Sequence, residues 1–326
     1  MSPPRAVVAV GGNALTRQDQ QGSWQQIADN AAVMAAPLAR LVEQDWQVAV
    51  VHGNGPQVGN LAIQQDAAED QVPPQPLHLL CAMTQGQLGS VLARAVDEHC
   101  GRGRAVAVVT HVQVDLADPA FAAPTKPIGP FFDEDRARVL ADQRGWTMVE
   151  DAGRGHRRVV SSPRPVEVLE VRAICTLLAA GHVVLAAGGG GVAVGVQQDG
   201  TLCGADAVID KDHAAAALAT AIGAHALYLL TGVDSVLIDF GTPQQRPAHR
   251  LTPQEAERHL ADGQFPAGSM GPKVAAALRF LRNGGQRAII TSAELLSDAA
   301  AGTPGAGTTI EPERAAGSGY GAAAAS

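Results

Sequence analysis

Short apolar runs alternate along this chain with segments of helical periodicity. In the first third, the apolar runs resemble buried strands, and two of them end directly at glycine. The segment from Ser23 has apolar residues at helical spacing, and its S-x-x-Q start is a capping box. We predict strands at 5–10, 47–52 and 104–114, and helices at 23–44, 56–68 and 77–99.

The same alternation resumes after residue 165. We predict helices at 166–180, from Lys211 onward and at 270–284, strands at 182–187, 226–234 and 287–292, and a hairpin-like segment at 235–240. Strands that alternate with helices are typical of an α/β protein with a mainly parallel sheet that is covered on both faces. The fold class that we predict is therefore α/β, built on a mainly parallel open sheet.

Residues 113–165 interrupt this rhythm, because they are rich in proline, glycine and charge. We interpret this segment as an inserted subdomain or lid within one domain that spans residues 1–310. The remaining tail, residues 311–326, has little to bury, and we expect it to be disordered.

Composition narrows the class of function. The chain has 326 residues, of which 46% are hydrophobic, and a net charge of −8. This acidic balance argues against nucleic acid or an anionic membrane surface as the main partner, since both attract concentrated basic charge. The four cysteines are far apart and lack zinc-type spacing, and no signal peptide or long apolar span is evident. We expect a cytoplasmic protein without a structural metal.

Glycines follow several of the predicted strands, at Gly11 and Gly12, Gly53 and Gly55, 188–191, and Gly232. Each loop alone could be a tight turn. Ligands of parallel sheets bind at the carboxyl ends of the strands, so four such loops predict an extended anionic ligand, such as a nucleotide beside a second phosphate-bearing molecule. The GxxxxGK[ST] phosphate loop is absent. A G-x-G-x-x-A match at Gly188, Gly190 and Ala193 leaves a dinucleotide open.

Lysine occurs only three times, at Lys126, Lys211 and Lys273, while the other twenty-one basic residues are arginine. Each lysine lies in a loop or at a predicted helix start. Phosphoryl transfer needs compact positive charge where the phosphate oxygens gather negative charge, which an ammonium group supplies. We therefore predict catalytic roles for the three lysines. The alternative is that they are ordinary residues of a solvent-exposed surface, where lysine has been kept by chance.

Two aspartates flank Lys211. We predict that Asp210 positions lysines through charge-assisted hydrogen bonds. For both Asp210 and Asp212 the alternative is helix N-capping, and that alternative is stronger for Asp212.

Ten segments of the chain, taken together and in order, resemble the carbamate kinase family of the amino acid kinase superfamily. The more specific ones are HGNGPQVGN, TKPIGPF and VIDKD; the others are AVGGNAL, AMTQGQLG, EDAGRG, GGGGVAV, LTGVD, GSMGPK and AIITS. The resemblance implies a three-layer αβα fold, usually a homodimer. It also implies reversible, Mg²⁺-dependent phosphoryl transfer between ATP and carbamate, giving ADP and carbamoyl phosphate.

Site residues follow from the same resemblance. Carbamate or carbamoyl phosphate would be held by Gly11, Gly12, Asn13, Gly53, Asn54 and Gly55. Lys126 matches a lysine of a closing subdomain, and Asp210, Lys211 and Lys273 match an organising aspartate and two phosphate-binding lysines. Thr231, Gly232, Val233 and Met270 match segments that line the nucleotide site, to which we add Gly188, Gly189 and Asp212.

The chain departs from the family pattern at His156, where tryptophan is usual, and at Ser161, where proline is usual. Both lie in the predicted lid. Three alternatives stay open: a superfamily member with another small anionic acceptor, such as an acyl amino acid or a nucleoside monophosphate; a nucleotide- or carbamoyl phosphate-binding protein without turnover; and a dehydrogenase.

Overall fold

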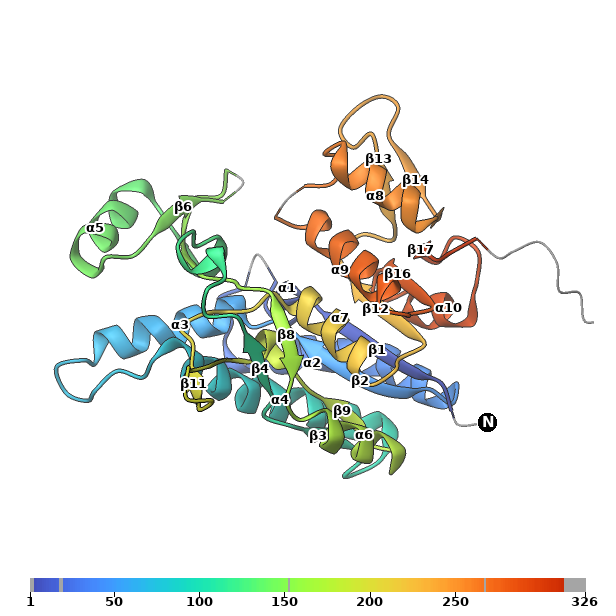
Figure 1. Cartoon of the computed structure of the whole chain (residues 1–326), viewed down its shortest axis with the longest axis horizontal. Helices are drawn as coiled ribbons and strands as arrows, with labels where there is room; N and C mark the ends of the chain where they lie inside the picture. Colours follow the sequence, from blue (N-terminus) through green and yellow to red (C-terminus); the bar gives the residue numbers. More distant parts are fainter. Residues whose placement is uncertain (1–2, 18–19, 152, 267, 314–326) are drawn as a thin grey trace, which may run out of the picture.

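A central sheet of eight strands forms the middle layer of the protein (Figure 1). The computed structural model describes residues 3–17, 20–151, 153–266 and 268–313. The strand order is β15-β17-β16-β12-β1-β2-β9-β3, and every neighbouring pair is parallel except β16 and β17. The strands are β1 (Arg5–Val10), β2 (Gln47–His52), β3 (Ala105–Ala107), β9 (Val183–Leu185), β12 (Ala226–Leu230), β15 (Arg250–Leu251), β16 (Arg287–Thr291) and β17 (Thr308–Ile310).

Helices cover both faces of this sheet, because alternate residues of each strand point to opposite sides. In β1, Val7 and Ala9 belong to the core under α6 (Val171–Ala179), α7 (Lys211–Ala221) and α9 (Met270–Arg282). Ala6, Val8 and Val10 belong to the core under α2 (Trp24–Glu43), α4 (Leu77–Cys100) and α10 (Leu296–Ala301). The predicted α/β fold with a mainly parallel sheet between two helical layers is confirmed.

The remaining helices are short or lie at the edges of the sheet. They are α1 (Gly12–Leu15), α3 (Gly55–Ala67), α5 (Glu134–Arg144) and α8 (Pro253–Ala261), with 3₁₀ turns η1 (Pro119–Phe121) and η2 (Gly188–Gly190). The capping box predicted at Ser23 is present at the start of α2, where the Ser23 side chain accepts from the backbone N–H of Gln26. No helix among the described residues is long and apolar enough to cross a membrane.

The predicted single strand 104–114 is wrong, because the chain leaves the central sheet after β3. Its second part is β4 (His111–Val114), which belongs to a separate sheet of order β11-β10-β4-β8. Gln85 of α4 holds the chain at this break: its side chain accepts from the Thr110 N–H and donates to the Thr110 carbonyl, which also accepts from the Val192 N–H at the start of β10. The other strands are β8 (Pro165–Val168), β10 (Val192–Val196) and β11 (Leu202–Gly204).

The predicted helix 166–180 begins too early. Residues 165–168 form β8, which pairs antiparallel with β4, and α6 starts only after Glu170. The Glu170 carboxylate accepts from the backbone N–H and the Nδ1 of His111, which fixes the end of β8 beside β4.

A small subdomain projects from the body of the molecule (Figure 1). It contains α5 and a three-stranded antiparallel sheet of β5 (Lys126–Phe132), β6 (Met148–Glu150) and β7 (His156–Val160). These elements lie within the range 113–165 that we predict as a lid, while Val114 and Pro165 at its ends pair in the four-stranded sheet. Another lobe carries the hairpin of β13 (Val236–Ile238) and β14 (Arg246–Ala248). The predicted tail lies mostly outside the described residues.

Candidate active site

Four glycine loops meet at one edge of the central sheet. They follow β12, β1, β2 and β9, which are neighbours in the sheet and parallel, so their carboxyl ends lie side by side. A cavity of about 760 Å³ opens there, lined by Gly11, Gly53, Gly189 and Gly232, one residue from each loop. The arrangement matches the crevice in which parallel sheets hold their ligands.

The loop after β2 brings a helix start to the cavity. Gly55 begins α3 and Pro56 occupies its first turn, where no intrahelical N–H bond is needed. Asn54 precedes the helix, but its amide donates to Thr84 Oγ1 at 2.9 Å and does not cap α3. A Cβ on Gly189 would come within 2.2 Å of Asn54 Nδ2, so glycine is required there for the two loops to pack.

All three lysines of the chain line this one cavity. Lys126 begins β5 of the small subdomain, Lys211 is the first residue of α7, and Lys273 lies in the first turn of α9. They come from segments that are 62 or more positions apart in the sequence, yet their ammonium groups are linked through two aspartates, Asp210 and Asp212. Three isolated cations of the sequence thus become one charged cluster.

Asp210 connects the subdomain to the body of the molecule. Its Oδ2 accepts from Lys126 Nζ at 2.5 Å, and its Oδ1 accepts from the backbone N–H groups of Asp212 and His213. Asp210 is therefore the N-cap of α7 as well as the partner of Lys126.

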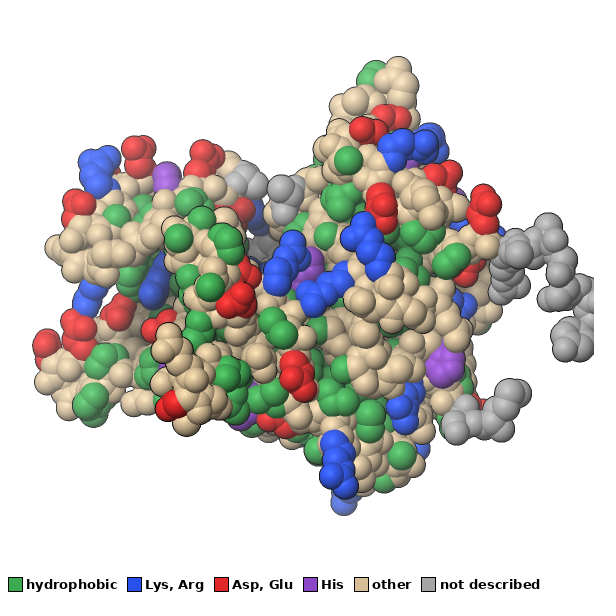
Figure 2. All heavy atoms as spheres, in the orientation of Figure 1, with side chains coloured by type: hydrophobic (Ala, Val, Ile, Leu, Met, Phe, Trp, Pro, Cys, Tyr) green, Lys and Arg blue, Asp and Glu red, His purple; other side chains and the backbone are tan. Residues whose placement is uncertain are grey.

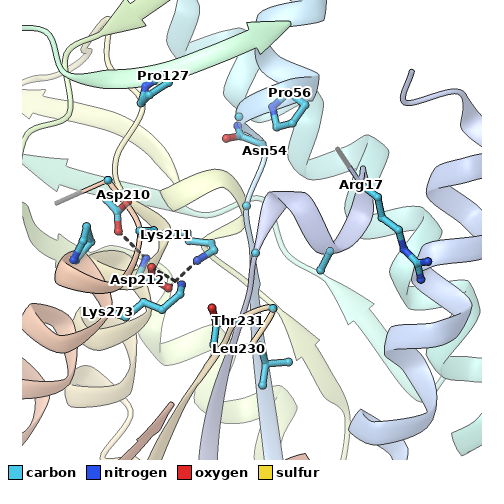
Figure 3. A pocket seen from close by; sticks show the side chains of 18 of the residues that line it. Arg17, Asn54, Pro56, Pro127, Asp210, Lys211, Asp212, Leu230, Thr231 and Lys273 are labelled. Carbon is cyan, nitrogen blue, oxygen red and sulfur yellow. Dashed lines mark hydrogen bonds and ion pairs between the residues drawn. The ribbon is translucent and has the colours of Figure 1, made fainter. Parts of the chain in front are cut away.

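Asp212 holds the other two lysines. Its Oδ1 accepts from Lys211 Nζ at 2.7 Å and its Oδ2 from Lys273 Nζ at 2.9 Å. The three side chains point toward one another in Figure 3, and no more than 11% of each is exposed to solvent. The interpretation of Asp212 as a helix cap is wrong, since Asp210 is the cap and Asp212 lies two positions later, within the first turn of α7.

The protonation states follow from this pairing. Burial alone would raise the pKa of Asp210, but the charges of Lys126 and Lys211 outweigh burial and hold it well below its usual range. In the same way, Lys211 and Lys273 lower the pKa of Asp212 against the effect of burial. Both aspartates are therefore carboxylates at neutral pH.

The two lysines on Asp212 differ. Burial would lower the pKa of Lys211, but Asp212 and Asp210 reverse this effect and raise it above its ordinary value. For Lys273, burial dominates, and together with the nearby charge of Lys211 it lowers the pKa to about 8 despite Asp212. Lys211 is a permanent cation, while Lys273 can lose its proton near physiological pH.

Gly12 and Asn13 follow Gly11 in α1, and their relation to the cavity lies outside the described part of the structure. Three other predicted site residues lie outside the cavity lining. Gly188 packs behind the loop, where a Cβ would meet His52. Val233 is 44% exposed beyond the cavity, and Met270 begins α9 with its side chain partly buried against the core. The cavity lining holds the other predicted residues, which are Gly11, Gly53, Asn54, Gly55, Lys126, Gly189, Asp210, Lys211, Asp212, Thr231, Gly232 and Lys273.

Several residues that line the cavity were not predicted from the sequence, because the prediction relied mainly on lysines and glycines. Arg154 and Arg157 reach the cavity from the subdomain, where Arg157 donates to the Gly129 carbonyl and pairs with Asp151. Ser292 follows β16, and its buried hydroxyl has no partner among the described residues. The signal for Ser292 was its position at the end of the predicted strand 287–292, but no glycine marks the loop that follows. Arg17, Asp234, Ser269 and Glu294 also contribute to the lining.

His156 and Ser161, which depart from the family pattern, lie on β7 and just after it. His156 pairs opposite Phe132 and its buried Nδ1 has no partner among the described residues. Ser161 is buried, its hydroxyl donates to the Phe121 carbonyl, and its own carbonyl accepts from the Val208 N–H, so it joins the base of the subdomain to the segment before Asp210.

Comparison with known proteins fits this geometry. The profile of the amino acid kinase family matches residues 4–292. The chain belongs to the amino acid kinase family. It is 42% identical over 313 residues to the carbamate kinase of Pyrococcus horikoshii, an alignment that covers 94% of this chain and 99% of the relative. The carbamate kinase of Halobacterium salinarum is 44% identical and is covered to 98%, with 94% of this chain aligned.

Solved structures of this family superpose closely on the protein. The carbamate kinase of Giardia lamblia bound to AMP-PNP has a TM-score of 0.86 and 37% identity, over 96% of this chain and all of the relative. The same enzyme bound to citric acid gives a TM-score of 0.90. That relative binds an ATP analogue on this fold.

Proposed function

We propose that the protein is a carbamate kinase, which transfers a phosphoryl group reversibly between ATP and carbamate. The observation that carries the proposal is the convergence of all three lysines on one cavity, held by Asp210 and Asp212. The names and high coverage of the relatives support the same activity.

The two ends of the cavity suit the two substrates. Gly11, Gly53 and Gly55 offer backbone approach at the starts of α1 and α3, where a small anion can meet free N–H groups. Lys273, Thr231 and Gly232 lie at the other end, which we assign to the nucleotide. Lys211 is bonded to the same carboxylate as Lys273 and marks the junction between the two ends.

The cluster can stabilise the transfer without a general base. Carbamate is already an anion, so its oxygen attacks the γ-phosphorus as the bond from that phosphorus to the bridging oxygen of ATP breaks, and no proton moves in this step. Negative charge spreads over the transferred oxygens, and ammonium groups held in place in advance stabilise it without reorganisation. Asp210 and Asp212 hold the lysines in position until the phosphates arrive.

Mg²⁺ belongs to the proposal as the ion that accompanies the nucleotide. This ion prefers substrate phosphates, waters and one or two carboxylates, and Asp210 and Asp212 are carboxylates in the cavity lining. When bound, Mg²⁺ would neutralise phosphate charge. No group of three His, Cys, Asp or Glu side chains that could hold a metal alone is found among the described residues.

The subdomain would act as the lid of this site, since Lys126, Arg154 and Arg157 reach the cavity from it.

We also propose a homodimer, which light scattering at several protein concentrations would test.

Two alternative functions receive less support. The dinucleotide fingerprint needs a helix after its glycines, whereas the loop 188–191 continues into β10. A larger acceptor would have to fit between the Gly11 loop and Pro127 of the subdomain, which both line the cavity. A binder without turnover would not need three lysines in one cluster.

The assay is direct. Protein that is incubated with carbamoyl phosphate, ADP and Mg²⁺ should form ATP, and luciferase luminescence measures the ATP formed. Circular dichroism shows whether the sample is folded, and a panel of other acceptors with labelled ATP shows the substrate range. Folded protein that forms no ATP from carbamoyl phosphate would refute the proposal, and faster phosphorylation of an acyl amino acid or a nucleoside monophosphate would favour the alternative acceptor.

A further inference from the structure

A second concave surface lies outside the proposed active site. This groove has a volume of about 780 Å³ and is formed between β8, α7, α8 and α9. Its lining shares no residue with the lysine cavity. In Figure 2, basic side chains gather on the face where Figure 1 shows α7 and α9. A basic groove is a local exception on a chain whose net charge is −8.

Three arginines border the groove, and only one of them has an acidic partner among the described residues. Arg282 pairs with Glu257 at 2.8 Å. The guanidinium of Arg164 contacts His213 Nε2, and that of Arg279 donates to the Pro165 carbonyl at 2.7 Å. Both of these contacts are with neutral groups, so the positive charges of Arg164 and Arg279 are left without a counter-charge.

The histidine between them adds no negative charge. Arg164 can only donate a hydrogen bond, so His213 Nε2 must accept it, and the imidazole is neutral. Burial lowers the pKa of His213 to about 4, against the pull of Asp210. The nearby charge of Arg164 also adds to the effect of burial in lowering the pKa of Arg279, as expected for two guanidinium groups that face the same space.

The floor of the groove is apolar. It is made by side chains of α8 and α9, namely Leu260, Ala261, Ala275 and Leu278. An apolar floor beside unpaired guanidinium groups suits a ligand with an anionic head and an apolar body, because arginine binds phosphate and carboxylate oxygens through two parallel N–H donors.

We propose that this groove is a second ligand site, separate from the active site, which binds an organic phosphate through Arg164 and Arg279. The anionic head lies between the two guanidinium groups and the apolar body lies over Ala261 and Ala275. The site borders α7, the helix that carries Lys211, because His213 of that helix lines the groove. The backbone N–H of His213 donates to Asp210 Oδ1. Arg164 also follows β7 closely, so the groove lies at the base of the subdomain.

Phenyl phosphate is a suitable probe, titrated calorimetrically into protein saturated with AMP-PNP at constant ionic strength. We expect Arg164→Gln and Arg279→Gln each to weaken binding about tenfold or more, the scale of a charge-assisted hydrogen bond. Arg172→Gln, the same change on an exposed site of α6, should bind like the wild type. Inorganic phosphate should bind the wild type more weakly than phenyl phosphate, because it lacks the apolar body.

A further variant guards against misfolding, since Arg279 also contacts the Pro165 carbonyl. Ala261→Glu keeps both arginines and places a carboxylate in the groove from the exposed end of α8. It should abolish phenyl phosphate binding while the protein stays folded by circular dichroism. Binding that survives in both Ala261→Glu and Arg164→Gln, or that is lost in Lys211→Ala alone, would place the probe in the active site and overturn the proposal.

Discussion

Asp210 and Lys126 are 84 positions apart in the sequence, and their Oδ2 and Nζ atoms are 2.5 Å apart in the structure. The ion pair joins the subdomain to the N-cap of α7. A phosphate that enters the cavity therefore meets an ammonium group already held over it, and it can share Lys126 with Asp210. This relationship gives Asp210 two separable tasks, one of charge and one of helix capping.

We expect Asp210→Asn to lower turnover by about 10²-fold or more, because the carboxylate that holds Lys126 is lost. A loss of this size is typical when one group that stabilises transition-state charge is removed. The amide oxygen of asparagine can still cap α7. Asp210→Ala loses the cap as well, and it should be about 1 kcal/mol less stable than Asp210→Asn. Urea unfolding and the ATP assay measure the two effects. Equal stabilities of the two variants would contradict the capping role.

Lys211→Arg should lower turnover by about 10²-fold or more, although it keeps the positive charge. The buried ammonium fits against one oxygen of Asp212, and a planar guanidinium cannot take its place beside Lys273 without moving the cluster. The ATP assay with saturating substrates measures the loss.

The matched control for this change is Arg172→Lys, the reverse substitution on the exposed surface of α6. It should leave turnover unchanged. Near-normal turnover in Lys211→Arg would mean that positive charge alone suffices at this position, and that the scarcity of lysine in the chain has another origin.

Lys273 makes the activity dependent on pH. Its pKa is lowered to about 8, so the ammonium group is charged below that pH and loses its charge above it. In the proposed mechanism the charged form contacts phosphate, so kcat/KM for ADP should be level below about pH 8 and fall as the pH rises through this value. A profile of kcat/KM from pH 6 to pH 9.5 checks the direction.

A variant identifies the group responsible. Arginine at this position stays protonated over the whole range, so the residual activity of Lys273→Arg should lack the decline above pH 8. The same decline in both proteins would assign it to another group, such as the substrate.

Much of the fold could be predicted because local patterns and tertiary structure agree over the central sheet. Strands that are buried on both faces must be apolar throughout, and they stand out between amphipathic helices. The two errors arose where distant contacts decide the structure. Gln85 bonds to Thr110 between β3 and β4, and residues 165–168 pair with β4 as a strand. Neither partner is visible in the local periodicity.

The site was predictable to the extent that its chemistry needs a rare residue. Lysine is scarce in this chain, so its positions indicated a common task, and the structure places all three in one cavity. The roles of Asp210 and Asp212 could not be separated by spacing alone. They are two positions apart at a helix start, and the backbone conformation before the first turn decides which one caps the helix. Serine and arginine are more common than lysine in this chain, so the residue types of Ser292 and Arg154 gave no such signal.

The contact between α3 and the subdomain offers a test of how Lys126 is positioned. A Cβ on Gly59 would lie 2.0 Å from the backbone nitrogen of Gly129, far inside contact distance, so the two backbones touch because Gly59 has no side chain. Gly59→Ala must push β5 away from α3. Since Lys126 begins β5 and Gly55 begins α3, we expect turnover to fall about tenfold or more, as misplacement by about 1 Å can lower rates about 10²-fold.

Gly86→Ala is the matched control, because Gly86 lies within α4 and a Cβ there meets nothing within 4 Å. Alanine is favoured over glycine in a helix interior by about 1 kcal/mol, so Gly86→Ala should be slightly more stable than the wild type and fully active. Gly59→Ala gains the same helix propensity but should be less stable and less active. If Gly59→Ala behaves like Gly86→Ala in urea unfolding and in the ATP assay, the subdomain does not need this contact to position Lys126.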